Sequence, residues 1–542
     1  MEILNRIHIA LHNAGMANRI LKPQQIQCFD YICKGHDVIA VLPTGFGKSV
    51  LFQLLPDILP TKTTINIVIV LCPLSSIIED QLHSLKIMSI NAGVLPSRYE
   101  NENCETLFNN EDMGMAADIH LPDDLVNGLT SIVFAHPEDL LSDVGRKLMK
   151  SDVYQKNVVA CVIDEGHCVE MWGNDFRKDF KGLSCLKAMF PSVPTLVLTA
   201  TAPPQLILDL KKSLCLSDNC KVIKKNPNRS NIFLDREKRL SNNHGYDSYS
   251  AILKPIAEDL LNQGTNYPIT IIYMKLKYCG FAYSLFNKTL QEKQYDGSEK
   301  TPSSRLFAQF HSPQTRKMKQ EIITELKKEH SRIRVIFATT ALGMGVDAPY
   351  VSNVIHIGPS SNLECYFQEI GRAGRSGHPA KATIYFNNSD IAANKCTIND
   401  AMKWYCQSDG VCLRKILLEY FGFHNVVQKN CCRVCNGFDY NASQTVAVKI
   451  PVNQTKVRTL SVADVPVLFK QLQQVLLECE KLLNDSKYTA LYHHGVLPSA
   501  SEIMESIEFI LNEDDLLKNF SIYDELCASK LIALLDIYAP AI

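Results

Sequence analysis

The chain has 542 residues, of which 46% are hydrophobic and 21% charged, and its formal net charge is −1. This length predicts several domains with buried cores, and the near-neutral charge argues against a protein whose whole surface is a basic nucleic-acid binder. No apolar run is long enough to span a bilayer and the first residues lack a signal-peptide pattern, so we expect no membrane segment and mostly reduced thiols among the 19 cysteines.

The first strongly patterned segment is a strand, a loop and a helix at residues 37–55. The loop contains Thr44, Gly45, Gly47, Lys48 and Ser49. Glycines allow backbone N–H groups to converge on phosphate oxygens, a lysine reaches the β- and γ-phosphates, and a hydroxyl ligates magnesium. The segment therefore predicts a site for ATP and magnesium, followed by a helix that Pro56 ends or kinks.

Polar residues close to this segment each have two interpretations. Upstream, Gln25 has one amide donor and one acceptor with which to read an adenine edge, although a surface glutamine is the simpler interpretation. A buried strand is expected at residues 64–72, and the hydroxyls of Ser75 and Ser76 after it either contact a nucleic-acid backbone or cap a helix. The polar residues 100–124 predict a loop.

Further strands are expected at residues 131–135 and 157–163, and the second of these leads into Asp164, Glu165 and His167. Ligands bind at the carboxyl ends of parallel strands, where an aspartate can hold magnesium and a glutamate can deprotonate an attacking water. The loop that follows contains Trp172, Phe176, Arg177 and Phe180. Aromatic rings stack on bases and an arginine meets phosphates, so the stretch predicts nucleotide chemistry coupled to single-strand binding. The alternative is a solvated acidic turn with a few core aromatics.

The chain then continues the alternation of strands and helices. A strand is expected at residues 195–198, and the small residues 199–202 after it are placed to relay the state of the phosphate site. Further strands are expected at residues 269–273, 332–338 and 351–357. The polar residues 291–304 predict a mobile loop between them.

A glycine-rich turn near the end of this half contains Gln368, Arg372 and Arg375. Two arginines three residues apart, entering from another domain, suit an arginine finger that stabilises charge on a transferring phosphoryl group. A solvated arginine face is the alternative. The glycines around both arginines and the preceding glutamine favour the finger.

With these segments in order, the chain resembles the RecQ family of superfamily-two DNA helicases over residues 20–435. The matching segments are residues 42–49 (motif I), 75–81 (motif Ia), 164–167 (motif II), 168–180 (the aromatic-rich loop), 199–202 (motif III), 338–347 (motif V) and 368–375 (motif VI). Gln25 matches the family's adenine-reading glutamine. The resemblance implies two RecA-like lobes that close on ATP, a zinc module, and 3′-to-5′ translocation on single-stranded DNA.

A cysteine cluster follows the last of these motifs. Cys432 and Cys435 have the Cys-x-x-Cys spacing that lets two thiolates share a tetrahedral zinc, with reduced core thiols as the alternative. The segment resembles the family's zinc module, in which one cysteine, here Cys412, opens a helix and a knuckle follows. The family's last cysteine falls near Phe438, so Cys431 or Cys406 is expected to take its place.

The sequence departs from the family in three places. Gly166 stands in motif II where alanine is usual, and residues 310–312 match only the histidine of a motif that normally continues with a small residue and glycine. Residues 441–542 match neither the winged-helix nor the HRDC domain of larger members, and they are expected to be largely helical around 465–483 and 501–516.

We therefore expect an α/β protein with two tandem RecA-like parallel-sheet lobes, a small helical zinc-binding module and a mostly helical C-terminal region. The expected boundaries are 1–205 and 206–390 for the lobes, 391–440 for the zinc module and 441–542 for the helical region. By resemblance, nucleotide and magnesium are bound by Gln25, Thr44, Gly45, Gly47, Lys48, Ser49, Asp164 and Asp347. Glu165 would be the catalytic base, with Gln368, Arg372 and Arg375 acting from the second lobe and His167 joining the aromatic-rich loop to DNA.

The resemblance implies a nuclear, ATP-dependent 3′-to-5′ helicase that acts on single-stranded and forked DNA in repair or recombination. Three alternatives stay open. One is a DNA-stimulated translocase without efficient strand separation, because the winged helix of larger members is not recognisable. The second is an RNA helicase, and the third is a non-catalytic nucleic-acid scaffold.

Overall fold

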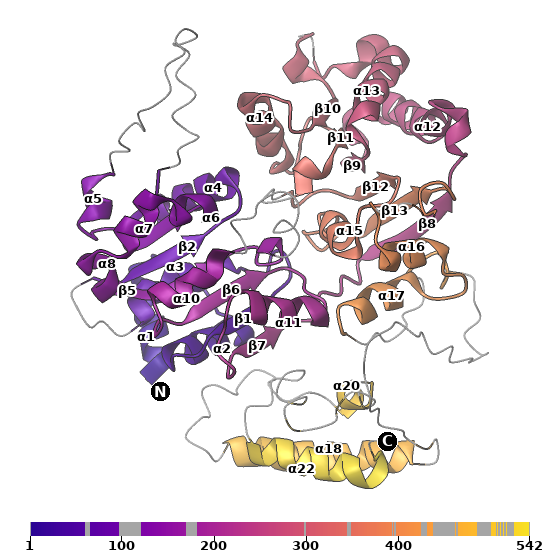
Figure 1. The fold of residues 1–542 in the computed structure, drawn as a ribbon. Helices are drawn as coiled ribbons and strands as arrows, with labels where there is room; N and C mark the ends of the chain where they lie inside the picture. The colour runs from indigo at the N-terminus through magenta and orange to yellow at the C-terminus, as the bar shows by residue number, and fades with distance from the viewer. Residues whose placement is uncertain are drawn as a thin grey trace. The chain divides into compact units, whose positions relative to one another are not determined.

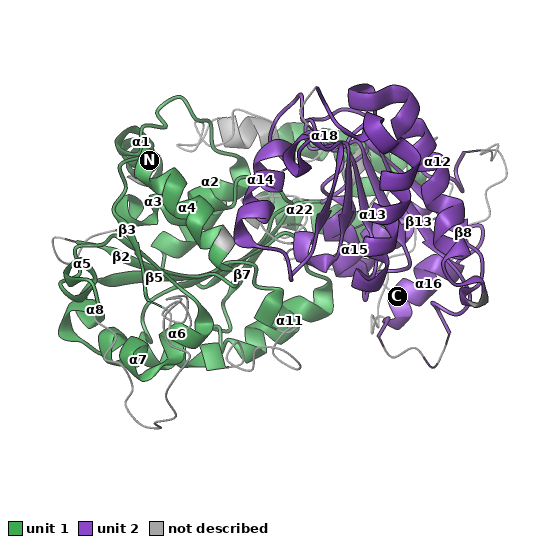
Figure 2. Ribbon diagram, turned by 90° about the horizontal axis from the view of Figure 1, so that it is seen from above, with its two compact units in different colours: residues 1–226, 449–542 green, residues 227–448 purple. Residues whose placement is uncertain are grey.

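The computed structural model describes residues 2–59, 65–96, 121–169, 182–297, 300–343, 348–392, 394, 397–423, 431–436, 461 and 464–484, and of the last segment residues 500–505, 507, 510, 513, 516 and 525–540. The chain divides into two compact units (Figure 2). The first unit comprises Met1–Asn226 and Lys449–Ile542, and the second comprises Pro227–Val448. Each unit is described by itself.

The first unit is built on a seven-stranded sheet with the order β3-β4-β2-β5-β6-β1-β7, in which all described pairs are parallel. Its strands are β1 (Val38–Val41), β2 (Ile67–Leu71), β3 (Ala92–Val94), β4 (Ile132–Ala135), β5 (Val158–Ile163), β6 (Thr195–Thr199) and β7 (Lys221–Lys224). The central strands are buried along their whole length, which explains why they are continuous apolar runs in the sequence.

Helices connect these parallel strands, as such a sheet requires (Figure 1). They are α1 (Glu2–Asn13), α2 (Pro23–Cys33), α3 (Ser49–Ile58), α4 (Ser75–Ile87), α5 (Asp123–Val126), α6 (Pro137–Leu141), α7 (Asp143–Met149), α8 (Asp152–Asn157), α10 (Cys185–Met189) and α11 (Pro204–Ser213). The sequence predicted that Pro56 either ends or kinks the helix. Pro56 does not end it, because α3 continues through Pro56 to Ile58. A proline so close to a helix C-terminus removes only one backbone hydrogen bond.

The second unit contains a six-stranded sheet with the order β10-β11-β9-β12-β13-β8, and its described pairs are also all parallel. Its strands are β8 (Ile232–Lys238), β9 (Thr270–Tyr273), β10 (Phe307–Phe310), β11 (Val335–Ala338), β12 (Asn353–Ile357) and β13 (Ala380–Phe386). Its helices are α12 (Asp247–Gln263), α13 (Leu276–Leu290), α14 (Arg316–Leu326), α15 (Leu363–Ile370), α16 (Asp400–Gln407) and α17 (Leu413–Tyr420). The prediction of two parallel-sheet lobes is confirmed.

Two expected segments differ in detail. The first sheet reaches β7, which pairs with β1, so it extends past the boundary expected after residue 205. The polar insertion at 291–304, expected to be a mobile loop, contains two short 3₁₀ turns, Gln291–Gln294 and Pro302–Ser304, and an isolated bridge joins Tyr295 to Arg305. Local side-chain hydrogen bonds order this polar segment, and composition alone does not reveal them. Most of the loop expected at 100–124 lies outside the described residues.

The C-terminal region is helical where it is described, as predicted. Its helices are α18 (Val465–Asn484), α20 (Ala500–Glu505) and α22 (Glu525–Tyr538). α18 and α22 lie side by side (Figure 1), and buried leucines such as Leu472 and Leu531 belong to the core that the helices share. Within the described part of the chain, no helix is both long and apolar enough to cross a membrane.

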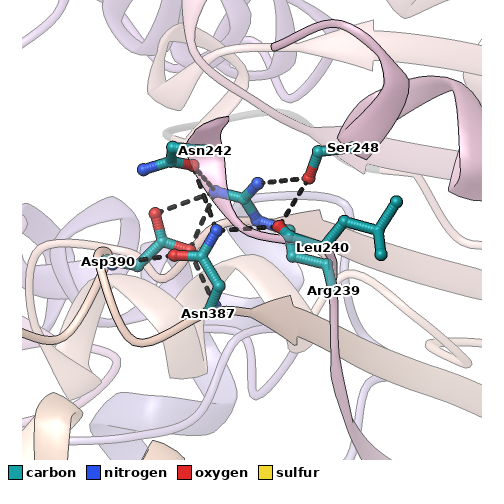
Figure 3. Close-up of polar contacts among 6 residues, drawn as sticks. All are labelled: Arg239, Leu240, Asn242, Ser248, Asn387 and Asp390. Carbon is teal, nitrogen blue, oxygen red and sulfur yellow. Dashed lines mark hydrogen bonds and ion pairs between the residues drawn. The ribbon is translucent and has the colours of Figure 1, made fainter. Parts of the chain in front are cut away.

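In the second unit, a buried polar network connects the segments that follow the carboxyl ends of β8 and β13 (Figure 3). Arg239, directly after β8, donates from Nη2 to both carboxylate oxygens of Asp390 at 2.9 Å. Asn387, directly after β13, donates to the carbonyl oxygen of Leu240 at 3.0 Å. Because each buried charge has a partner, the network holds two adjacent loops without leaving an unpaired ion in the core.

The first unit has a comparable anchor in Asp37, which lies just before β1 and is 1% exposed. Its Oδ1 accepts hydrogen bonds from Lys187 Nζ at 2.6 Å and from the backbone N–H of Thr195 at 2.8 Å, while Oδ2 accepts from the N–H of Ser217 at 2.8 Å. Burial alone would raise the pKa of Asp37, but Lys187 and the two N–H groups outweigh burial and hold it below its ordinary value. One carboxylate thus ties together the chain segments that lead into β1, β6 and β7.

We expect Asp37→Asn to lower the free energy of unfolding of the first unit by about 3 kcal/mol, because Lys187 would lose its anionic partner and the amide keeps only one oxygen for the three donors. The folded-state pKa of Asp37 is depressed, so its contribution should be complete at neutral pH and disappear as the pH falls below about 4. Urea unfolding at two pH values measures both effects. Asp152→Ala is the control, since Asp152 forms only a surface pair with Lys156, and a loss of stability as large as that of Asp37→Asn would contradict the interpretation.

Candidate functional site

The phosphate loop lies between β1 and α3, as the sequence predicts. Gly47 has φ = +86°, a conformation that costs an L-residue free energy, and a Cβ there would meet Arg19 Nη2 and Gln25 Nε2 at 3.0 Å each. α3 begins at Ser49, so the first backbone N–H groups of the helix lack intrahelical partners at the end of this loop. The loop therefore presents backbone donors of the kind that bind phosphate.

Gln25 lies against the phosphate loop and uses both ends of its amide. Its Nε2 donates to the carbonyl oxygens of Phe46 at 3.2 Å and Gly47 at 2.9 Å, and its Oε1 accepts from the N–H of Lys22 at 2.8 Å. The side chain is 2% exposed. In this conformation Gln25 supports the loop, and it has to release these contacts before it can read an adenine, a role that stays a prediction.

Lys48 and Ser49 follow the loop glycines. Lys48 Nζ donates to the carbonyl oxygen of Leu42 at 3.4 Å, so its ammonium folds back over the loop. Ser49 Oγ accepts a hydrogen bond from Gln81 Nε2 at 3.1 Å. Thr44 and Gly45 lie in the same loop, and Gly45 also has a positive φ of +78°.

The acidic pair follows β5. The backbone N–H of Asp164 donates to the carbonyl oxygen of Leu71 at 2.9 Å, which fixes the pair beside the end of β2. Burial, and then the neighbouring Glu165 carboxylate, raise the pKa of Asp164 to about 7, although Lys48 acts in the opposite direction. The ionised form of Asp164 is therefore costly in this structure, and a bound cation would favour it. A hydroxyl at Ser49 and a carboxylate at Asp164 are hard oxygen ligands, so these residues fit a magnesium ion.

His167 connects the acidic pair to the end of β6. Its Nδ1 lies 3.3 Å from Glu165 Oε2 and 3.3 Å from Thr199 Oγ1, and the Thr199 hydroxyl donates to the carbonyl oxygen of Thr201 at 3.0 Å. Burial alone would lower the pKa of His167, but the Cys168 sulfur and the Glu165 carboxylate outweigh it and raise that pKa well above its ordinary value. The residues after β5 and β6 thus share one buried hydrogen-bond network.

Gly166, where the family pattern has alanine, has a steric explanation. A Cβ at this position would lie 2.4 Å from Cγ1 of Val197 on β6, a distance that real Cβ atoms do not adopt. The N–H of Gly166 also donates to the carbonyl oxygen of Leu198 at 2.8 Å, so the backbone approaches β6 closely. Glycine allows the acidic turn to lie directly on β6 beside this valine.

The second unit contains the predicted arginine turn. Gln368 lies on α15, and Arg372 and Arg375 lie in the turn that follows this helix. Arg372 is 2% exposed, and burial raises the pKa of Tyr273 at the end of β9 while the nearby Arg372 acts in the opposite direction. The structure thus places both arginines at one end of α15, and their role as fingers stays a prediction.

A buried carboxylate that the sequence did not suggest lies beside this turn. Glu369 Oε2 accepts from Ser360 Oγ at 2.6 Å and lies 2.8 Å from His356 Nε2. The ring of His356 stacks on that of Tyr273, with centroids 4.9 Å apart. The sequence signal for this site was an acidic residue, Glu369, on the buried face of α15. The residues that contact Glu369 lie on other segments, so the sequence did not reveal them.

Trp172, Phe176, Arg177 and Phe180 of the aromatic-rich loop, together with Asp347, lie outside the described residues. Their predicted contacts with DNA and nucleotide therefore stay predictions.

The structure brings together four cysteines of the second unit: Cys412, Cys431, Cys432 and Cys435. All are buried, and their sulfur atoms lie within 4.8 Å of one another. The Sγ of Cys412 is 3.4 Å from that of Cys431 and 3.8 Å from that of Cys432. Zinc–sulfur bonds of about 2.3 Å in a tetrahedron place the sulfurs about 3.8 Å apart, so these residues fit a structural zinc. Cys406 is buried but is not in this group, so Cys431 supplies the fourth sulfur.

The cysteine cluster is held against the edge strand of the second sheet. The N–H of Leu234 on β8 donates to the carbonyl oxygen of Cys431 at 3.2 Å, and the N–H of Arg433 donates to the carbonyl oxygen of Leu234 at 2.9 Å. The buried Arg414 donates to Asn228 Oδ1 at 2.8 Å. The cluster therefore extends the fold of this unit at β8.

Comparisons with known proteins agree with this geometry. A model of the DEAD/DEAH box helicases matches residues 22–210, and a model of the helicase conserved C-terminal domain matches residues 260–377. The chain is 29% identical to the ATP-dependent helicase SGS1 of Saccharomyces cerevisiae over 80% of this chain and 28% of that protein. It is 30% identical to the RecQ-like DNA helicase blm-1 of Caenorhabditis elegans over 76% of this chain and 39% of that protein.

The chain thus spans less than half the length of both relatives. Among solved structures, the DUF1998 helicase MrfA bound to DNA has a TM-score of 0.52 and 18% identity, covering 72% of this chain and 52% of that one. This likeness concerns the fold alone.

Substituting Gly47 tests the phosphate loop. We expect Gly47→Ala to weaken nucleotide binding at least tenfold, because the positive φ strains alanine and its Cβ meets Arg19 and Gln25. Gly377→Ala is a matched control, since Gly377 has φ = +88° but no atom within 4 Å of its Cβ position. Titration with a fluorescent ATP analogue measures the difference, and equal affinities for the two variants would contradict the assignment.

Proposed function

The chain belongs to the RecQ family of superfamily-two helicases, and we propose that it is an ATP-dependent DNA helicase that moves 3′ to 5′ along single-stranded DNA and unwinds duplexes. The observation that carries this proposal is the network around His167. It joins the acidic residue proposed as the catalytic base to the end of β6, next to the segment proposed to bind DNA.

In this proposal the first unit binds the nucleotide. The backbone of residues 44–49 and the ammonium of Lys48 bind the phosphates, and Ser49 and Asp164 would hold magnesium. Bound magnesium would supply positive charge that neutralises the phosphate oxygens. Gln25 and Asp347 complete the set of residues that we assign to the nucleotide.

Hydrolysis of ATP requires a base and a stabiliser of charge. Glu165 orients the attacking water and accepts its proton. Gln368, Arg372 and Arg375 stabilise the negative charge that develops on the γ-phosphoryl group, and guanidinium groups are suited to this task because they always carry charge. The Glu369 carboxylate and its partners at the end of α15 would position the turn that carries these arginines.

His167 is proposed to couple hydrolysis to DNA. While Glu165 Oε2 lies 3.3 Å from Nδ1 of His167, the imidazole stabilises its carboxylate and makes it a weaker base. Single-stranded DNA on Trp172, Phe176, Arg177 and Phe180 would move the adjoining turn and release Glu165 for catalysis. The strand then advances as the lobes close on ATP and open after hydrolysis.

The remaining assignments come from the family. We assign single-stranded and forked DNA as the substrate, a role in DNA repair or recombination, and a nuclear location. We assign zinc to the four cysteines of the second unit, because their burial and sulfur spacing suit a closed structural site.

ATP turnover with and without single-stranded DNA tests the proposal. We expect DNA to stimulate the wild type and Glu165→Gln to lose at least 100-fold in turnover while it still binds ATP, because only the base is removed. Trp172→Ala should keep basal turnover and lose the stimulation. Stimulation by RNA but not DNA would favour an RNA helicase, and nucleotide binding without turnover in the wild type would favour a scaffold. ATP turnover that is stimulated by DNA, without separation of the strands of forked DNA, would favour a translocase.

Thr199→Val tests the coupling network with a change that conserves shape. We expect DNA-stimulated turnover to fall about tenfold, because His167 Nδ1 loses one of its two partners and binds Glu165 more tightly. Thr195→Val on the same buried strand is the control, since its hydroxyl is outside this network. Equal stimulation in both variants would remove Thr199 from the mechanism.

Metal analysis tests the cysteine cluster. Purified wild-type protein should contain about one zinc per chain, and Cys435→Ser should lose it and unfold at a lower temperature, because three thiolates hold zinc less tightly. Cys406→Ser changes a buried cysteine of the same core outside the cluster and should retain the metal. Wild-type protein free of zinc after purification without chelators would show that the four residues are core thiols.

A further inference from the structure

A chain of two glutamines reaches the proposed magnesium ligand from a neighbouring helix. Gln81 on α4 donates from Nε2 to Ser49 Oγ at 3.1 Å. Gln53 on α3 donates from Nε2 to Gln81 Oε1 at 3.2 Å. Gln53 is buried and Gln81 is half-buried, and both amides find their partners inside the first unit. In this arrangement Oε1 of the Gln81 amide faces Gln53 and Nε2 faces Ser49.

The hydrogen-bond capacity of Ser49 makes this contact compatible with metal binding. A serine hydroxyl has one hydrogen to donate and two lone pairs to share. The Gln81 N–H occupies one lone pair, which leaves the other for a cation and the hydroxyl hydrogen for a phosphate oxygen. Gln81 therefore orients Ser49 without competing for its ligand function, as groups behind metal ligands commonly do.

The hydrogen bond from Gln81 also connects Ser49 to α4, the helix that carries Gln81. α4 starts at Ser75, immediately beyond β2, and Ser75 Oγ lies 3.1 Å from His136 Nε2, while His136 Nδ1 lies 2.9 Å from the carbonyl oxygen of Cys72. This start of α4 is the segment for which the sequence leaves nucleic-acid contact open. Gln81 lies six residues further along, about 9 Å along the helix axis. A movement of α4 would therefore be transmitted to Ser49 through the hydrogen bond from Gln81.

We propose that Gln81 is a positioning residue that holds Ser49 for magnesium and reports the position of α4 to the nucleotide site. This inference rests on the proposed function, because it takes Ser49 as the magnesium ligand and α4 as a helix that DNA displaces. The route through Gln81 is separate from the one through His167: it acts on the binding of the metal–nucleotide complex, whereas His167 acts on the base. The competing explanation is that three polar groups in a half-buried space simply satisfy one another.

Magnesium dependence distinguishes the two explanations. Gln81→Leu keeps the size of the side chain and removes its donor. We expect the magnesium concentration that half-saturates binding of a fluorescent ATP analogue to rise about tenfold, with the affinity measured without magnesium unchanged. At limiting magnesium the variant should hydrolyse ATP more slowly, and excess magnesium should restore its rate. A purely structural role would lower thermal stability without any rescue by magnesium.

Two further variants complete the test. His83→Ala, at an exposed position of the same helix, should bind magnesium and nucleotide like the wild type. Gln53→Leu removes only the hydrogen bond from Gln53 to Gln81. It should shift the half-saturating magnesium concentration in the same direction by about threefold. It also carries the test if Gln81→Leu does not fold. Half-saturating concentrations equal to that of the wild type in the folded glutamine variants would overturn the inference.

The failure of this inference and the failure of the proposed function give different results. If single-stranded DNA does not stimulate the wild type, the proposed function fails, while the shift in magnesium dependence still reports on Gln81 and Ser49. If DNA stimulates the wild type and Gln81→Leu binds the magnesium–nucleotide complex normally, the inference fails and the proposed function stands.

Discussion

The parallel pairing of three neighbouring strands is the constraint on which the candidate nucleotide site depends. β5 pairs with β6 and β6 pairs with β1, all in the same direction, so the segments after these strands leave the sheet at one edge. The phosphate loop follows β1, the acidic pair follows β5, and Thr199 ends β6. Because neighbouring strands are only about 4.8 Å apart, short polar side chains at their ends reach one another directly.

Burial of charge has opposite consequences at two aspartates of this unit. Asp37 accepts three hydrogen bonds, one of them from an ammonium, and its pKa is lowered. Asp164 is also buried but has Glu165 as its neighbour, and its pKa is raised. The difference lies in the partners, because burial by itself raises both values. Asp37 is thus satisfied by the fold, whereas Asp164 lies beside a second carboxylate, and a bound cation would favour its ionised form.

The second unit follows the same rule around its own buried charges. Both carboxylate oxygens of Asp390 accept from Arg239 and Oδ2 also accepts from the N–H of Asn387, while Glu369 is held by Ser360 and His356. The first pair fixes two loops at the edge of the sheet. The second set lies at the end of α15, where the arginine turn begins. An arginine finger requires a rigid base, since its positive charge must arrive in a defined place.

The glutamines of the first unit show how one residue type can support a phosphate loop in different ways. Gln25 holds the carbonyl oxygens of the loop, and Gln81 holds the hydroxyl at the start of the following helix. Neither amide contacts the other. Gln25 has to release the loop before it can contact a ligand, whereas the bond from Gln81 leaves one lone pair of Ser49 free for a metal ion.

The sequence by itself determined the local features of this protein. Continuous apolar runs gave the parallel strands, because a strand buried on both faces has no polar positions, and the spacing of Gly47, Lys48 and Ser49 gave the phosphate loop. The cysteine spacing likewise indicated a cluster that the fold brings together. Only the tertiary structure decided that Asp37 meets Lys187, that Gln25 holds the loop, and that Gln81 reaches Ser49. These pairs join segments far apart in the chain, and residue periodicity reports only the geometry of neighbouring residues, whereas contact between distant segments depends on how the sheet and its helices pack.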